Sequence, residues 1–244
     1  MSRNVYFSFH YQDVIDFRAN VVRNSGKFRQ KGAEFRDSSI WEEAGEKQIT
    51  KIKTLIDDEL KGSSVTCALI GSETYSRRFV RYELLKSFEM KKGQVGVGIN
   101  WIKDKVGNTK FWAGENPCNY LGLKVSRDGK TIDFFERKEN SWITFRDLPL
   151  IQNSHFRKES FGKEFTLSDF YKRYSCDWDN GKKNFPTWIE EAAKKAGRQS
   201  NKMASELIIQ LQNRNGSFNC EKFDHKPSPK SVYIAICFTD NNQS

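Results

Sequence analysis

Glu83 is the residue of this sequence that is best placed to do chemistry. It lies in a predicted helix, directly above Phe79 at i−4 and roughly 60° away from the apolar stripe at ~100° per residue. A carboxylate at the edge of a core, just past the carboxyl end of a sheet strand, lies where α/β folds bind ligands. The alternative is a solvated helix glutamate, which is the common case for this residue type.

The elements around Glu83 follow from the pattern of the neighbouring residues. Residues 64–71 (SVTCALIG) are almost continuously apolar, which predicts a parallel strand that is covered on both faces. The helix after it keeps one apolar stripe, formed by Val80, Leu84 and Phe88. The turn between them offers three capable N-caps, Ser72, Thr74 and Ser76. The sequence thus predicts a strand, a turn and a helix that holds one acid at the edge of the core.

Two adjacent arginines, Arg77 and Arg78, stand at the start of this helix. Cations at a helix N-terminus are disfavoured by the macrodipole by ~0.3–1 kcal/mol each. A bound anion would offset this cost, and backbone N–H groups would help to hold it. The candidate anions are a substrate phosphate and a neighbouring acidic surface, and the remaining alternative is that both arginines are solvated.

Other residue types give weaker chemical signals. His10 follows the predicted first strand and is a candidate general base, although a histidine that only packs or caps is the more frequent case. The five cysteines form no CxxC pair, which predicts reduced thiols in a cytoplasm. Cys220, His225 and Cys237 are too few ligands for a zinc site, so no metal is expected. A P-loop is absent, and nucleoside triphosphate hydrolysis is not expected.

Strands and helices alternate over the first hundred residues. The first strand, Val5–Phe9, places Ser8 and His10 at its carboxyl end. A helix capped by Asp13 follows, with Val14, Phe17 and Val21 on its apolar face, and then a strand near Ala33–Asp37. The next helix buries Ile49, Ile52, Ile56 and Leu60. After the strand and helix around Glu83, another strand is predicted at Gln94–Ile99. This alternation predicts an α/β fold with a parallel sheet flanked by helices.

The rest of the chain follows a different pattern. Short predicted strands at Lys124–Ser126, Thr131–Glu136 and Trp142–Phe145 are joined by turn dipeptides and would form an antiparallel insertion. A short helix is predicted at Leu167–Tyr174. Pro186 suits the first position of a helix through Lys195, and a helix at Ser200–Asn213 and a strand at Ser231–Phe238 would follow. The predicted domains are therefore residues 1–185 and a C-terminal α+β extension of residues 186–244.

The charge of the chain bounds its partners. Lys and Arg number 41 against 31 Asp and Glu, a net charge of +10, which can attract nucleic acid, anionic membrane or a phosphorylated small molecule. No basic run and no stripe of interleaved aromatic and basic residues occurs, so nucleic-acid binding is not expected. No stretch approaches ~20 apolar residues and the N-terminus lacks an apolar signal region, so a cytoplasmic protein without a membrane span is expected.

Four segments together carry a resemblance to a known family. They are residues 5–14 (VYFSFHYQDV), the segment from Asp37 to Trp41-Glu-Glu, residues 66–87 (TCALIGSETYSRRFVRYELLKS) and residues 116–122 (NPCNYLG). In combination they resemble the TIR-like proteins of bacterial Thoeris anti-phage systems, in particular the signal-producing ThsB component. The resemblance extends over roughly residues 4–185 and implies a TIR-like (flavodoxin-like) parallel sheet.

The resemblance implies an enzyme that responds to a phage trigger. Such a protein cleaves the nicotinamide–ribose bond of NAD and makes a cyclic ADP-ribose isomer, or a related conjugate, that activates a partner effector protein; NAD is the substrate and no cofactor is expected. The family's catalytic glutamate, in a W-x-x-x-E motif, corresponds to Glu83, and Phe79 stands in place of the tryptophan. By resemblance the pocket is lined by Ser8, Phe9, His10, Asp37 and Trp41. Because they stand at a helix N-terminus, Arg77 and Arg78 are also predicted to contact the pyrophosphate of NAD.

Three alternatives remain open at this point. The first is a TIR module that assembles through its loop 38–46 without catalysis. The second is a flavodoxin-like or response-regulator-like binding module, which would need a phosphate loop or an acidic cluster that the segment after the first strand lacks. The third is a nucleic-acid-binding protein, suggested by the net charge of +10. Because SVYIAICF is too apolar to stay exposed, residues 186–244 are also expected to govern self-association, as in a homo-oligomer, or partner contact.

Overall fold

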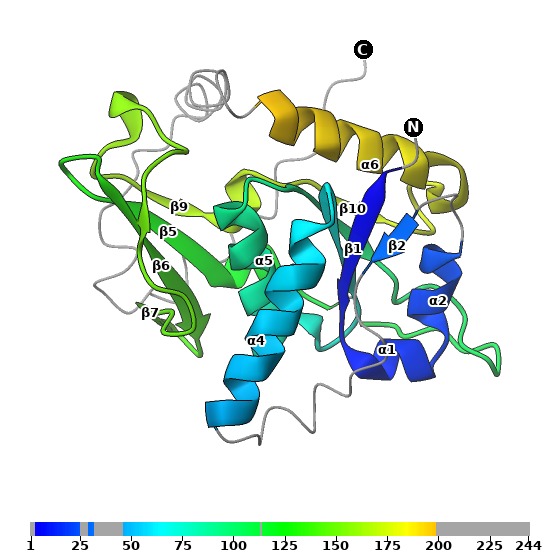
Figure 1. The fold of residues 1–244 in the computed structure, drawn as a ribbon. Coiled ribbons are helices and arrows are strands. Elements are labelled where there is room, and N and C mark those ends of the chain that lie inside the picture. The colour runs from blue at the N-terminus through cyan, green and yellow to red at the C-terminus, as the bar shows by residue number, and fades with distance from the viewer. Residues whose placement is uncertain (1–2, 25–28, 32–45, 113, 199–244) are drawn as a thin grey trace, which may run out of the picture.

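A parallel sheet forms the centre of the computed structural model, which describes residues 3–24, 29–31, 46–112 and 114–198 (Figure 1). Its strands lie in the order β10-β4-β3-β1-β2, and every recorded pair in this five-stranded sheet is parallel. The strands are β1 (Asn4–Phe9), β2 (Arg29–Lys31), β3 (Val65–Ile70), β4 (Gly93–Gly98) and β10 (Arg173–Ser175). The predicted α/β class is confirmed.

The strand order creates a switch point between β1 and β3. The chain passes from β1 to β2 on one side and then returns to β3 on the other side of β1. In the β1–β3 pair, Ser8 lies opposite Ala68 and Phe9 opposite Leu69. Ligands of doubly wound sheets bind in the crevice beyond the carboxyl ends of such a strand pair. The ends of β1 and β3 are therefore the expected place for a site.

Helices cover both faces of the parallel sheet. They are α1 (Tyr11–Ile15), α2 (Arg18–Arg23), α4 (Glu46–Lys61), α5 (Arg78–Glu89) and α6 (Gly181–Arg198). One buried cluster joins α4 and α5 to Tyr6, Ala68 and Ile70, and a second joins α2 and α6 to Val5, Phe7, Val65, Cys67 and Leu69. Because successive strand residues point to opposite faces, β3 contributes to both clusters, and all six of its residues are buried.

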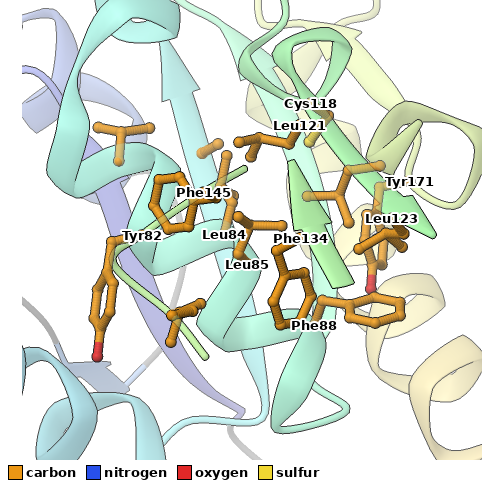
Figure 2. Close-up of a cluster of buried hydrophobic side chains, with 14 of the residues drawn as sticks. Tyr82, Leu84, Leu85, Phe88, Cys118, Leu121, Leu123, Phe134, Phe145 and Tyr171 are labelled. Atoms are coloured by element: carbon orange, nitrogen blue, oxygen red, sulfur yellow. The ribbon is translucent and has the colours of Figure 1, made fainter. Parts of the chain in front are cut away.

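A second, antiparallel sheet packs against α5. Its strands are β5 (Leu121–Val125), β6 (Thr131–Lys138), β7 (Ser141–Thr144), β8 (Ile151–Gln152) and β9 (Glu164–Thr166), with the order β7-β6-β5-β9 and β8 paired to β6. Figure 2 shows Leu84 and Phe88 of α5 among Leu123 and Phe134 of this sheet, all within one buried cluster. The predicted antiparallel insertion is confirmed, and it shares a core with the helix that carries Glu83.

The segment after β1 differs from its prediction. Phe17 adopts a left-handed conformation (φ 67°) that separates α1 from α2, so the single predicted helix does not form. Phe17 and Val21, predicted on the buried face, are exposed, and Arg18, Ala19 and Val22 are buried instead. The Arg18 guanidinium accounts for this rotation, since it donates to the carbonyl oxygens of Ile102 (2.9 Å) and Asn108 (3.0 Å) and pairs with Asp16 and Asp104.

Other element boundaries also move. β2 lies at Arg29–Lys31, ahead of the predicted strand at Ala33–Asp37, which is outside the described residues. The predicted helix at Leu167–Tyr174 was wrong: a 3₁₀ turn at Leu167–Asp169, closed by a capping box between Thr166 and Asp169, leads into β10. Residues 173–175 pair in parallel with residues 96–98 of β4, and this pairing replaces the predicted last helical turn.

The helix predicted to begin at Pro186 begins at Gly181. Phe185, Trp188 and Ile189 belong to its buried face against the parallel sheet, and this packing outweighs the penalty of a proline inside the helix. The boundary predicted between residues 185 and 186 therefore falls within α6. The helix predicted at Ser200–Asn213 and the strand at Ser231–Phe238 lie outside the described residues. Across the described part of the chain, no helix combines the length and apolar character of a membrane span.

Candidate active site

Two hydroxyl groups of β1 hold the carboxylate of Glu83. Tyr6 donates a hydrogen bond of 2.6 Å to Oε1, and Ser8 donates one of 2.5 Å to Oε2. Glu83 is only 9% exposed, and both hydroxyl-bearing residues are buried. Hydrogen bonds to an ionised acceptor are among the stronger ones in proteins. The carboxylate is therefore fixed in direction above the carboxyl-terminal half of β1.

The sequence pattern explains why these three side chains meet. Tyr6 and Ser8 are two residues apart in a strand and so face the same side of the sheet. The buried stripe Val80, Leu84 and Phe88 presses α5 onto that side. Glu83, next to the stripe, then lies above β1 at the height of Tyr6 and Ser8.

The start of α5 is built differently from the prediction. Ser72, Thr74 and Ser76 do not cap it; Arg77 is the N-cap residue and makes no side-chain cap hydrogen bond. Residues Thr74–Ser76 instead form a 3₁₀ turn, η1, between β3 and α5. One turn into α5, Phe79 is 6% exposed and belongs to the core cluster that Tyr6 also joins. Phe79 thus lies one helical turn before Glu83, and its role as an aromatic wall of the site stays a prediction.

The end of β1 brings two further predicted residues to the same edge. Phe9 is half-buried, and the Arg23 guanidinium lies 5.7 Å above its ring. His10 is buried, and its carbonyl oxygen accepts a hydrogen bond of 3.0 Å from the backbone N–H of Asp13. Both follow Ser8 directly, at the carboxyl end of the strand. Asp37 and Trp41 fall outside the described residues.

The two arginines at the helix start already have acidic partners within the chain. Arg77 is paired with Glu73, and Arg78 donates two hydrogen bonds to Asp147, at 2.7 Å and 2.6 Å. Burial alone would raise the pKa of Asp147, but hydrogen bonds from Arg78 and Lys53 outweigh it and lower this pKa. Arg78 stands about 140° around the helix from Glu83. Of the anions predicted at the helix start, the structure provides an acidic side chain, Asp147, as the partner of Arg78. A substrate contact by Arg77 and Arg78 stays a prediction.

Tyr6 was missed as a site residue by sequence reasoning. The two-residue period of β1 that placed Ser8 at the site places Tyr6 on the same face, one position deeper. That period was the available signal. The period of β1 does not say which strand residue Glu83 lies over. The packing of α5 determines this, and it brings Glu83 within hydrogen-bond distance of Tyr6.

The arrangement suits electrostatic chemistry by a fixed carboxylate. Within the described ranges, no group of three or more His, Cys, Asp or Glu residues is arranged to hold a metal ion. A carboxylate whose orientation is set in advance can stabilise positive charge that develops nearby, and it can accept a hydrogen bond from a sugar hydroxyl. Thiol chemistry has little support here, because burial raises the pKa of Cys118 to about 12 and of Cys176 to about 11.

Comparison with known proteins defines the class of this fold and site. A family model described as "Thoeris protein ThsB, TIR-like domain" matches residues 6–104, which include β1 from Tyr6 onward and the whole of β3, α5 and β4. The part of the chain that carries β1, β3, β4 and Glu83 is thus a TIR-like domain.

A relative extends the match beyond that domain. The chain is 44% identical over 192 residues to "Putative cyclic ADP-D-ribose synthase ThsB1" of Bacillus cereus (strain MSX-D12), an alignment that covers 78% of this chain and 100% of the relative. The chain belongs to the ThsB family of Thoeris TIR-like proteins.

Proposed function

We propose that this protein cleaves the nicotinamide–ribose bond of NAD and closes the remainder into a cyclic ADP-ribose isomer or a related ADP-ribose signal. The observation that carries the proposal is the Glu83 carboxylate, held by the Tyr6 and Ser8 hydroxyls at the switch point of the sheet. The name of the 44% identical relative, a cyclic ADP-D-ribose synthase, supports the same reaction. NAD is the substrate, and no separate cofactor is invoked.

In the proposed first step, the bond between the ribose C1′ and the nicotinamide nitrogen breaks. The electron pair goes to the nicotinamide ring, which leaves neutral, and the ribose acquires oxocarbenium character. Glu83 stabilises that positive charge, and burial strengthens the interaction because little water screens it. Tyr6 and Ser8 hold the carboxylate in place, so that little reorganisation is needed as the charge develops.

In the proposed second step, an adenine nitrogen or a ribose hydroxyl of the same molecule attacks C1′ and releases a proton to solvent. The balance is NAD⁺ to nicotinamide, cyclic product and H⁺. A folded substrate competes with water through its high effective molarity, provided that the pocket holds it in that conformation.

The remaining predicted residues are proposed to bind the substrate around Glu83. The substrate pocket is lined by Ser8, Phe9, His10, Asp37, Trp41 and Phe79. Arg77 and Arg78 are included as pyrophosphate contacts that must first part from Glu73 and Asp147. The signal then activates an effector protein of the same cytoplasmic defence system, after a phage trigger, and the enzyme works as a homo-oligomer.

Incubation of the purified full chain with NAD tests the proposal. The reaction is run alone and with lysate of phage-infected cells, and nicotinamide and nucleotide products are followed by chromatography and mass spectrometry. The Glu83→Gln protein in the same lysate corrects for other NAD-consuming enzymes. The proposal expects nicotinamide and a product with the mass of NAD minus nicotinamide. A wild-type protein that releases no more nicotinamide than Glu83→Gln under both conditions would favour the non-catalytic TIR module.

A further inference from the structure

Asp13 is a second buried carboxylate near the switch point, and it lies outside the Glu83 site. The residue is 1% exposed in α1. The Thr74 hydroxyl lies 3.4 Å from its Oδ2, and the Lys110 ammonium lies 3.8 Å from its Oδ1. A Cβ atom at Gly71 would fall 2.2 Å from Oδ2, so this glycine makes room for the carboxylate. Asp13 thus fills a space between the segments that follow β1, β3 and β4.

The contacts of Asp13 connect the two strands that frame the site. Its backbone N–H donates to the carbonyl oxygen of His10 at 3.0 Å, directly after β1. On the β3 side, the Thr74 hydroxyl accepts a hydrogen bond of 2.9 Å from the Gly71 N–H. The same hydroxyl can donate to Asp13 or to the Leu69 carbonyl oxygen, 3.3 Å away. Thr74 opens the η1 turn that leads into α5.

We propose that ionised Asp13 is a positioning residue that fastens the segment after β1 to the turn before α5, and so keeps Ser8 and Glu83 in register for the reaction. The inference rests on the proposed NAD cleavage. Its geometric basis is that the Asp13 carboxylate contacts Thr74 of the turn while its backbone holds His10 of the strand end. A shift of about 1 Å at such a junction is enough to reduce turnover strongly.

The electrostatic surroundings of Asp13 make this fastening sensitive to pH. Burial raises the pKa of Asp13 to about 6, and Asp16, in the turn between α1 and α2, raises it as well. Lys110 after β4, Arg18 in α2 and the Thr74 hydrogen bond act in the opposite direction. Asp13 is therefore ionised at neutral pH and becomes protonated as the pH falls through 6. Protonation of the Asp13 carboxylate removes its attraction for the Lys110 ammonium. It also makes the carboxyl a weaker acceptor, so the Thr74 hydroxyl no longer favours Asp13 over the Leu69 carbonyl oxygen.

The same raised pKa sets the sign of its effect on stability. The native state binds this proton more tightly than the unfolded chain does, so the contribution of Asp13 to stability falls as the pH rises from about 4 to about 6. A neutral residue of the same shape should therefore stabilise the fold at pH 7.5. A residue with a purely structural role would show that gain without any loss of turnover.

The test compares full-length wild-type protein with Asp13→Asn. We expect Asp13→Asn to raise Tm at pH 7.5 and to lower kcat for nicotinamide release about tenfold. We also expect it to abolish the fall in wild-type rate below about pH 6. Asp16→Asn is the matched control, because Asp16 also pairs with Lys110, at 3.0 Å. It should keep the wild-type kcat at pH 7.5 and an acid limb, which moves to lower pH because Asp16 raises the pKa of Asp13. Thr74→Val, which removes the hydroxyl that joins the two segments, should lower kcat as Asp13→Asn does.

An Asp13→Asn protein with wild-type kcat and an unchanged acid limb would overturn the inference. If Asp13→Asn does not fold, the Thr74→Val variant is used in its place. Wild-type kcat in Thr74→Val would then overturn the inference. Amide hydrogen exchange of residues 71–83 gives a readout that needs no turnover. Faster exchange of these residues in Asp13→Asn than in wild type at pH 7.5 supports the inference even if NAD cleavage itself fails, and unchanged exchange contradicts it.

Discussion

The hydroxyl of Tyr6 donates a 2.6 Å hydrogen bond to Oε1 of Glu83, although 77 positions separate the two residues in the chain. The bond crosses from β1 to α5 inside the buried core, where a hydrogen bond to a charged group contributes about 1.5–3 kcal/mol. It therefore ties the orientation of the carboxylate to the strand.

Removal of that hydroxyl gives the first prediction. We expect Tyr6→Phe to keep the fold and to lower kcat for nicotinamide release by roughly tenfold or more, because Glu83 loses one of the two hydroxyls that orient it. Tyr82→Phe is the matched control: its hydroxyl donates to Asp57 at 2.9 Å, away from the Glu83 carboxylate, and should not affect kcat. Equal rates for the two variants would argue against an orienting role for Tyr6.

The strand and helix at the centre of the site were predictable because their patterns are local. The apolar run of β3 and the stripe Val80, Leu84 and Phe88 indicate which faces are buried. The two-residue period of β1 gives the face of Ser8, and the length of the strand places it near the carboxyl end. Glu83 could be singled out as a polar residue at the edge of that stripe.

What escaped prediction depends on contacts between distant segments. The break at Phe17 follows the burial of Arg18, whose guanidinium bonds the carbonyl oxygens of Ile102 and Asn108 in the loop after β4. The early start of α6 follows the packing of Phe185 on the sheet. Likewise, Asp13 reads as a helix cap in the sequence, and only the approach of Gly71 and Thr74 shows it to be a buried carboxylate.

Arg78 provides a prediction that separates two roles. If it contacts the pyrophosphate as proposed, Arg78→Ala should raise KM for NAD by roughly tenfold with little change in kcat, since uniform binding energy is lost. The variant also loses a half-exposed ion pair with Asp147, which is worth ~1 kcal/mol or less. Asp147→Asn is the control for that structural loss. A lower Tm with unchanged KM in Arg78→Ala would limit Arg78 to anchoring α5 on the segment between β7 and β8, which carries Asp147.

The shared core behind α5 gives a stability prediction. Phe88 is 4% exposed and contacts Phe134 edge-on, with ring centroids 6.4 Å apart. We expect Phe88→Ala to lower the free energy of unfolding by about 3–5 kcal/mol, measured by urea denaturation. Val106→Ala, at an exposed position, should change it by less than ~0.5 kcal/mol. A loss below ~1 kcal/mol for Phe88→Ala would contradict the packing of the antiparallel sheet onto α5.

The central claim is that Glu83 performs the cleavage of NAD. The most direct measurement is the initial rate of nicotinamide release from NAD by wild type, Glu83→Gln and Glu89→Gln, together with the masses of the products. Equal Tm values show that the three proteins are equally folded. Glu89 lies on the same helix and pairs with Lys86 at 2.9 Å, so its variant controls for the loss of one helix carboxylate. We expect nicotinamide and a cyclic product from wild type and Glu89→Gln, and neither from folded Glu83→Gln. Formation of the cyclic product by Glu83→Gln at the wild-type rate would contradict it.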